Sequence, residues 1–162
     1  MPIQIQQLDH TYLPGSALAY PALSGISLTI QDGEFLGIIG HTGSGKSTLI
    51  QHLNGLLLPT SGSVLVDGLD TREKKLRKQI RSLVGMVFQY PEYQLFEETV
   101  ARDVAFGPKN MGIPEAEIET HVTEALRLVG LNPAEFSEKS PFELSGGEKR
   151  RAALAGTLAM RP

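Results

Sequence analysis

The segment from Gly40 to Ser47 carries the pattern G-x-x-x-x-G-K-S, which constrains the fold more than any other feature of the sequence. Its glycines let the backbone curl, so that successive amide hydrogens converge on one anion. A helix that begins near Lys46 adds unpaired N–H groups and a partial positive charge. The Lys46 ammonium can reach β- and γ-phosphates, and the Ser47 hydroxyl can ligate Mg²⁺. We call Gly40–Ser47 the phosphate loop and expect it to bind a nucleotide between a strand and a helix.

Apolar segments on both sides of the phosphate loop predict strands. Ile3–Ile5 and Ile26–Ile30 alternate apolar and polar residues, as half-buried strands do. The Asp32-Gly33 turn suggests a hairpin that joins the second of these segments to the next strand. The next strand is expected at Phe35–Ile39, a continuous apolar run typical of a strand covered on both faces. Further strands are expected at Val64–Val66 and Val84–Phe88.

Four segments have the apolar spacing or the start and stop residues of helices. They are Ser47–Asn54 with Gly55 as its stop, a short helix from Thr99 that Gly107-Pro108 breaks, Pro114–Val129, and Ser145 to about Met160. Strands and helices thus alternate around the apolar strand that feeds the phosphate loop. This order predicts an α/β fold with a mainly parallel sheet and an antiparallel β portion at the N-terminus.

The bulk composition narrows the class of protein. The 162 residues suit about one domain, and 41% hydrophobic residues suffice for an ordinary core. The net charge of −3 argues against a nucleic-acid binder, and the basic stretch Arg72–Arg81 is expected to be a solvated helix face or loop. No cysteine is available for a disulfide, a thiolate metal site or a nucleophile. Neither a secretory signal nor an apolar run near the roughly 20 residues of a membrane span is visible.

A second motif, Leu144-Ser-Gly-Gly-Glu148, lies far beyond the phosphate loop. Ser145 and Glu148 form S-x-x-E, which is by itself the capping box of a helix start. The motif also resembles the L-S-G-G-Q signature of ABC ATPases, at the distance from the phosphate loop that is usual in that family. The resemblance implies a P-loop NTPase fold of the ABC ATPase type, and we call Leu144–Glu148 the signature.

The resemblance also implies how ATP would be held. In ABC ATPases two subunits pack head to tail, so that Ser145, Gly146 and Gly147 would contact the γ-phosphate bound by a partner chain. The family pattern has Gln at the fifth position of the signature, and this chain has Glu148 there. A residue expected beside the nucleotide therefore differs from the family pattern. Within one chain, ATP would lie against the phosphate loop and the residue after it, namely Gly40, His41, Thr42, Gly43, Ser44, Gly45, Lys46, Ser47 and Thr48.

Two further positions fit the family pattern. Gln89 resembles the Q-loop glutamine, which would ligate Mg²⁺ together with Ser47 and act in catalysis with Lys46. Tyr12 resembles the aromatic residue that stacks on adenine. The same pattern suggests a nucleotide-binding core at about 1–88, a Q-loop and helical subdomain at about 89–144, and the signature helix at 145–160.

Several stretches resemble the ATPases of energy-coupling factor transporters, which import vitamins and metal ions such as cobalt or nickel. They include Gln51–Leu56, Phe88–Phe96, Glu98–Val100, Asp103–Asn110 and Ser140–Ser145, and the phosphate loop and Phe96–Thr99 are closer to the second of two related ATPase types. The resemblance implies a second ATPase subunit, an integral membrane component and a substrate-binding membrane protein as partners. The chain would be peripheral on the cytoplasmic face of the cell membrane and grip its partner with the region from Gln89 to about Asn110.

The family pattern continues beyond the signature helix, with a strand that ends in an Asp for Mg²⁺ and a Glu that polarises water, and later a switch His. These residues are not in the chain, which ends at Pro162, so we expect a fragment of a longer subunit with poor hydrolysis of its own. Phe35–Ile39 would lose its neighbour in the sheet. Two alternatives stay open: a non-catalytic nucleotide-binding module, and a soluble ABC-type ATPase of DNA repair or translation.

Overall fold

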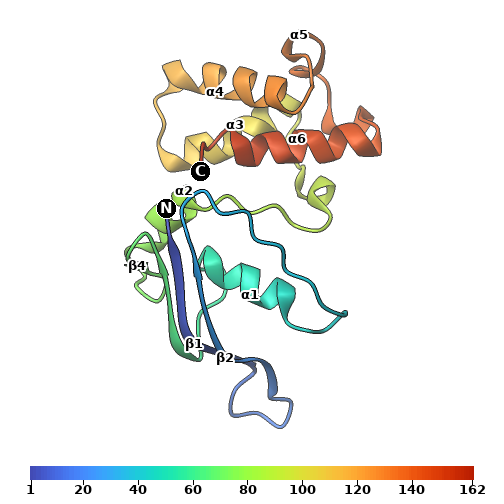
Figure 1. Cartoon of the computed structure of the whole chain (residues 1–162). Coiled ribbons are helices and arrows are strands. Elements are labelled where there is room, and N and C mark those ends of the chain that lie inside the picture. Colours follow the sequence, from blue (N-terminus) through green and yellow to red (C-terminus); the bar gives the residue numbers. More distant parts are fainter. The chain divides into compact units, whose positions relative to one another are not determined.

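The computed structural model describes all residues from Met1 to Pro162, and the chain divides into two compact units (Figure 1). The first unit is Met1–Val84 and holds the sheet, and the second is Gly85–Pro162 and is helical. Each unit has its own hydrophobic core. None of the helices combines the length and the apolar character that crossing a bilayer requires.

Four antiparallel strands form the sheet of the first unit. They are β1 (Ile3–Tyr12), β2 (Tyr20–Ile30), β3 (Ser61–Val66) and the short β4 (Leu69–Asp70), in the order β2-β1-β3-β4. The predicted strands Ile3–Ile5, Ile26–Ile30 and Val64–Val66 lie within β1, β2 and β3 and are confirmed. The antiparallel β portion expected at the N-terminus is therefore present.

A β-bulge in the middle of β1 changes which side chains face inward. Ile3 and Ile5 are buried before it, and Leu8 and His10 are buried after it, so the inward positions move from odd to even residue numbers. Gln7 has a positive φ of 45°, and the register of β1 slips at this point against both neighbouring strands. A slip of one residue moves every later side chain to the opposite face of the strand. The bulge therefore decides that His10 faces the interior of the unit.

Helix α1 (Lys46–Leu53) follows the phosphate loop and packs on the sheet, with Leu49 and Leu53 against the core. Gly55 has a φ of 66° and donates its N–H to the carbonyl of His52. This left-handed residue ends the helix where the sequence predicts. The buried apolar residues of this unit are Ile3, Ile5, Leu8, Leu23, Val64, Val66 and Ile80.

The basic stretch at Arg72–Arg81 is a turn followed by helix α2 (Arg77–Leu83). Arg72 forms an ion pair with Asp70 at 2.7 Å, and Lys78 is exposed on the helix. The expectation of a solvated loop or helix face is confirmed.

Two predicted strands, Phe35–Ile39 and Val84–Phe88, do not form, and this part of the prediction is wrong. The turn at Asp32-Gly33 is present, but no strand follows it to complete a hairpin. Phe35 is 99% exposed and Ile39 is 96% exposed, so neither face of their segment is covered. A strand exists only through hydrogen bonds to a neighbouring strand, and nothing in the chain pairs with either segment.

The second unit is a group of helices around an apolar centre. Its elements are η1 (Pro91–Gln94), α3 (Val100–Met111), α4 (Glu115–Leu128), α5 (Pro133–Phe136), η2 (Pro141–Glu143) and α6 (Gly146–Leu158). Helices α3, α4 and α6 contact one another pairwise. The helices predicted at Pro114–Val129 and from Ser145 to about Met160 are confirmed, with ends shifted by one or two residues.

Helix α3 passes through Gly107 and Pro108, so the predicted break there is wrong. Pro108 removes one helical hydrogen bond, but its ring is fully buried beside Val104 and Ala105 in the core. A Cβ on Gly107 would lie 2.7 Å from Cγ of Met160, so glycine allows this close packing. The helix ends instead at Gly112, which has a φ of 85°.

Candidate nucleotide-binding site

The phosphate loop curls through two glycines in the left-handed region. Gly43 has a φ of 84° and Gly45 a φ of 86°, which side-chain-bearing residues adopt at a cost. A Cβ on Gly45 would also lie 2.7 Å from the carbonyl oxygen of Ala22 on β2. Only glycine therefore fits at the point where the loop turns into α1.

The ammonium of Lys46 is folded back over the phosphate loop. Nζ donates to the carbonyl oxygens of Gly40 and His41, both at 2.8 Å, and lies 3.4 Å from Oγ of Ser44. A phosphate oxygen in the curve of the loop would meet this positive charge directly. The lysine thus sits where the sequence pattern requires it.

The first turn of α1 offers amides to the same region. Gly45 is the N-cap and has no side chain to accept from them, and the first helical bond runs from Leu49 N to Gly45 O at 2.8 Å. The N–H groups of the residues between, Lys46–Thr48, therefore have no acceptor within the helix. Unpaired amides at a helix N-terminus form an anion site.

Tyr12 ends β1 and connects it to the start of α1. Its hydroxyl lies 3.1 Å from Oγ1 of Thr48, and either group can donate. The side chain is 38% exposed, so the ring is partly accessible to a ligand. Tyr12 and Thr48 are thus held together beside the phosphate loop, and the stacking of Tyr12 on adenine stays a prediction.

Two buried histidines beside Thr48 were not among the predicted site residues. His52 on α1 donates from Nδ1 to the Thr48 carbonyl at 2.7 Å, and its Nε2 lies 3.1 Å from Nδ1 of His10 on β1. The pKa of His52 is lowered, and burial is the largest cause. The hydrogen bond to Thr48 acts in the opposite direction and raises the pKa, and the neighbouring His10 lowers it further. The spacing of Thr48 and His52 on one helix face was a usable signal, whereas the orientation of His10 depends on the bulge.

Gln89 and the signature belong to the second unit, whereas the phosphate loop and Tyr12 belong to the first. Gln89 is an exposed residue in a bend before η1. Its ligation of Mg²⁺ stays a prediction.

The signature forms the capping box that its S-x-x-E spacing predicts. Ser145 donates its N–H and its hydroxyl to one carboxylate oxygen of Glu148, at 2.8 and 2.7 Å, and its Oγ accepts from the Glu148 N–H at 3.4 Å. These bonds, first the hydroxyl and then the backbone N–H, lower the pKa of the Glu148 carboxyl. The amides of Gly146 and Gly147 have no acceptor in the helix, so they are available to an anion.

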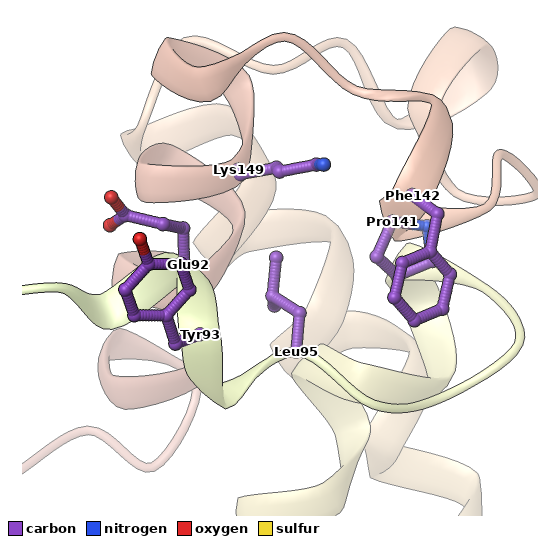
Figure 2. A pocket seen from close by; sticks show the side chains of 6 residues that line it. All are labelled: Glu92, Tyr93, Leu95, Pro141, Phe142 and Lys149. Carbon is purple, nitrogen blue, oxygen red and sulfur yellow. The ribbon is translucent and has the colours of Figure 1, made fainter.

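A pocket of about 250 Å³ lies within the second unit, between η1 and the segment before the signature. Figure 2 shows Glu92 and Tyr93 on one side of it and Pro141 and Phe142 on the other. Leu95 and Lys149 complete the lining. Arg150 on α6 forms an ion pair with Glu92 at 3.3 Å, which ties the signature helix to η1.

Comparison with known proteins decides the family. The sequence profile described as "ABC transporter" matches residues 23–162, which include the phosphate loop and the signature. This chain belongs to the ABC transporter family. Membership of this family implies nucleotide binding.

Curated relatives define a narrower group within the ABC transporter family. The energy-coupling factor transporter ATP-binding protein EcfA2 of Clostridium acetobutylicum is 58% identical over 163 residues, covering 100% of this chain and 57% of the relative. EcfA2 of Symbiobacterium thermophilum is 62% identical, covering 100% of this chain and 56% of the relative. The predicted resemblance to the second type of energy-coupling factor ATPase is confirmed. The chain spans little more than half the length of these relatives.

Solved ABC ATPase structures confirm the fold class. The structure of cbiO1 from Clostridium perfringens, described as part of the ABC transporter complex cbiONQ, has a TM-score of 0.82 and 40% identity and is matched over 99% of this chain and 62% of that one. The cassette MJ0796, described as a dimer in a post-hydrolysis state bound to ADP and Pi, has a TM-score of 0.85 and 30% identity, with 99% and 70% covered. The chain therefore has the ABC ATPase fold, although the strand pairs within it are antiparallel.

Proposed function

We propose that this chain is the ATP-binding part of an ATPase subunit that powers uptake through an energy-coupling factor transporter. One observation carries the proposal: the Lys46 ammonium and the free amides of the first turn of α1 meet around the curve of the phosphate loop. This arrangement suits a polyphosphate, because charge and aligned N–H groups act on the same oxygens. Tyr12, on the adjoining end of β1, supplies an aromatic ring for the base.

Mg²⁺ fits the groups that the chain offers beside the phosphates. Ser47 is exposed at the first turn of α1 and carries a hydroxyl oxygen. Ligation by Gln89 stays a prediction. Hard oxygen donors of this kind, together with phosphate oxygens, are what Mg²⁺ prefers. When bound, the ion would neutralise phosphate charge; Lys46 would hold the phosphates in place.

We infer that two such subunits enclose ATP between them. The signature presents the N-terminus of α6 with unpaired amides at Gly146 and Gly147, a second anion-binding helix end on the same chain. A head-to-tail pair would place this end against the phosphate loop of the partner. The dimeric arrangement in the description of MJ0796 supports this proposal.

We also propose a membrane component as a partner, bound through the region from Gln89 to about Asn110. This region exposes several aromatic rings: Tyr90 at 50%, Tyr93 at 83%, Phe96 at 57% and Phe106 at 47%. Apolar side chains gathered on a surface mark contacts with another protein. The description of cbiO1 as part of a complex supports the assignment, and uptake of a vitamin or transition-metal ion belongs to the same proposal.

Exchange of Lys46 tests the nucleotide site. The Lys46→Ala variant removes the ammonium that the loop carbonyls hold, so binding of MgATP in calorimetry should weaken by at least about tenfold, since about 1.4 kcal/mol corresponds to that factor. Lys78→Ala is the matched control, because it removes the same charge from an exposed position on α2. Unchanged MgATP affinity in Lys46→Ala would refute the assignment of the phosphate loop.

A further inference from the structure

Two imidazole rings, those of His10 and His52, are buried together and contact Tyr12 and Thr48. His52 is fully buried on α1, and His10 is 8% exposed on β1. Their rings meet edge to face with centroids 4.7 Å apart and an interplanar angle of 75°. Histidine is mostly found partly exposed, so a buried pair in contact needs a specific set of hydrogen-bond partners.

The neighbouring carbonyl groups fix the tautomer of each ring. A carbonyl only accepts, so His52 carries its proton on Nδ1, which donates to Thr48 O at 2.7 Å. Its Nε2 then accepts from Nδ1–H of His10 at 3.1 Å, and the same His10 nitrogen lies 3.1 Å from Leu58 O. His10 Nε2 is left as a buried nitrogen without a partner. His52 is therefore neutral in this arrangement.

The arrangement offers no free acceptor for an additional proton on His52. A proton on Nε2 of His52 would face the Nδ1–H donor of His10 and would share the Leu58 carbonyl, a minor raising effect on the pKa of His52, with that donor. The groups that face the pair are Tyr12 of β1, Thr48 of α1 and the carbonyl of Leu58, and none of them is a carboxylate. Protonation therefore requires the contacts to open.

The pair forms part of a closed ring of contacts at the nucleotide site. The His10 ring packs edge-on against the Tyr12 ring at 4.6 Å, and the Tyr12 hydroxyl bonds to Thr48. Thr48 in turn accepts from His52, which contacts His10. The ring thus joins the aromatic side chain at the end of β1 to the helix turn that follows the phosphate loop.

We propose that His10 and His52 are a positioning pair for the nucleotide site, which holds Tyr12 against the first turn of α1 while His52 is neutral and releases it when His52 is protonated. This inference rests on the proposed function, because it needs a nucleotide whose base lies on Tyr12. Release of Tyr12 weakens the hold on the base and leaves the hold of the phosphate loop on the triphosphate unchanged. ATP and methyl triphosphate, a triphosphate ester without a base, therefore respond differently to the state of the pair.

The sign of the pH effect follows from burial. Burial lowers the pKa of His52, so the closed arrangement takes up a proton less readily than the open one. The closed arrangement is fully favoured above the ordinary histidine pKa of about 6.5, and its population decreases as the pH falls below this value.

The test compares calorimetric affinities of the full chain for MgATP and for Mg-methyl triphosphate at about pH 7.5 and about pH 5.5, on either side of the ordinary histidine pKa. Each ligand is a triphosphate monoester with one terminal phosphate that titrates in this range, so the ratio of the two affinities isolates the contribution of the nucleoside. In the unchanged chain we expect the preference for ATP to fall by about tenfold at the lower pH, the order of one base-stacking contact. A ratio that is the same at both pH values would overturn the proposal.

Two variants separate positioning from mere structural support. His52→Asn can still donate to Thr48 O but cannot reach His10, so the preference for ATP should be about tenfold lower at both pH values. His52→Gln can still accept from His10 and cannot be protonated, so it should retain the preference and lose its pH dependence. If His52→Asn fails to fold, the comparison of the unchanged chain with His52→Gln still tests the proposal. A preference for ATP that still depends on pH in His52→Gln contradicts it.

A matched control is His121→Asn, which alters another buried histidine that donates from Nδ1 to a carbonyl, in this case Ala159 in the second unit. It should leave the ratio and its pH dependence unchanged. Failure of the proposed function has a distinct result, since neither MgATP nor Mg-methyl triphosphate would then bind. Equal affinities for the two ligands at about pH 7.5 would instead keep the phosphate site and overturn the positioning pair.

Discussion

The carboxyl of Glu148 accepts two hydrogen bonds from one residue, Ser145, so an acid can close the capping box at this position. Its pKa is lowered first by the Ser145 hydroxyl and then by the Ser145 N–H. The folded pKa lies below the unfolded one, so the stabilising effect is present at neutral pH and is lost as the pH falls through the folded pKa. The charge also lies at the N-terminus of α6, where the helix dipole favours an anion.

The Ser145→Ala variant should raise the pKa of Glu148, because it removes the larger of the two causes. A carbon-detected NMR titration of the glutamate carboxyls measures this midpoint directly. Ser140→Ala is the control, since Ser140 caps the neighbouring turn through Phe142 N and does not touch Glu148. An unchanged Glu148 midpoint in Ser145→Ala would show that the capping box does not form in solution.

At the scale of elements, the bulge in β1 depends on a glycine on the neighbouring strand. Gly62 of β3 has a φ of 79°, and a Cβ there would overlap the carbonyl oxygen of Gln7 and lie 2.5 Å from that of Gln6. Gly68, in the turn between β3 and β4, has nearly the same φ of 77° with nothing within 4 Å. Substitution of either glycine would strain the backbone to a similar extent. The two positions differ only in the space available to the added Cβ.

Gly68→Ala should therefore lower the free energy of unfolding by about 1–2 kcal/mol, the cost of a left-handed alanine. Gly62→Ala should cost this amount plus the overlap with the Gln7 carbonyl, about 3 kcal/mol or more in total. Urea denaturation followed by circular dichroism measures both. Equal losses in the two variants would mean that β3 does not approach the bulge so closely.

Local patterns were sufficient to predict some elements and not others. The helix Pro114–Val129 and the strand Val64–Val66 follow from spacing along a short segment, and both are present. The orientation of His10 and Tyr12 could not be predicted in this way, because the bulge needs Gly62, which is distant in the sequence. The continuation of α3 through Pro108 likewise depends on its burial in the core and not on its local propensity.

At the scale of the whole molecule, the motifs predicted the family correctly, because such motifs are short stretches of fixed residues. The strand at Phe35–Ile39 was predicted from its apolar run, and here the sequence was misleading. Apolar character shows that a segment tends to be buried, whereas pairing needs a neighbouring strand, and this chain, which spans 57% of its Clostridium acetobutylicum relative, provides none to it.

The exposure of Phe35 and Ile39 gives a prediction for the chain in solution. Their rings and methyl groups contact water, so exchanging both for Ser should change the free energy of unfolding by less than about 0.5 kcal/mol. The double variant should also bind less of a hydrophobic dye and aggregate less, because an exposed apolar patch is removed. Ile5→Ser is the contrasting variant, since Ile5 is 3% exposed in the sheet core and its loss should cost about 3 kcal/mol. A loss of similar size in the double variant would mean that another part of the chain, or a second copy, covers Phe35–Ile39 in solution.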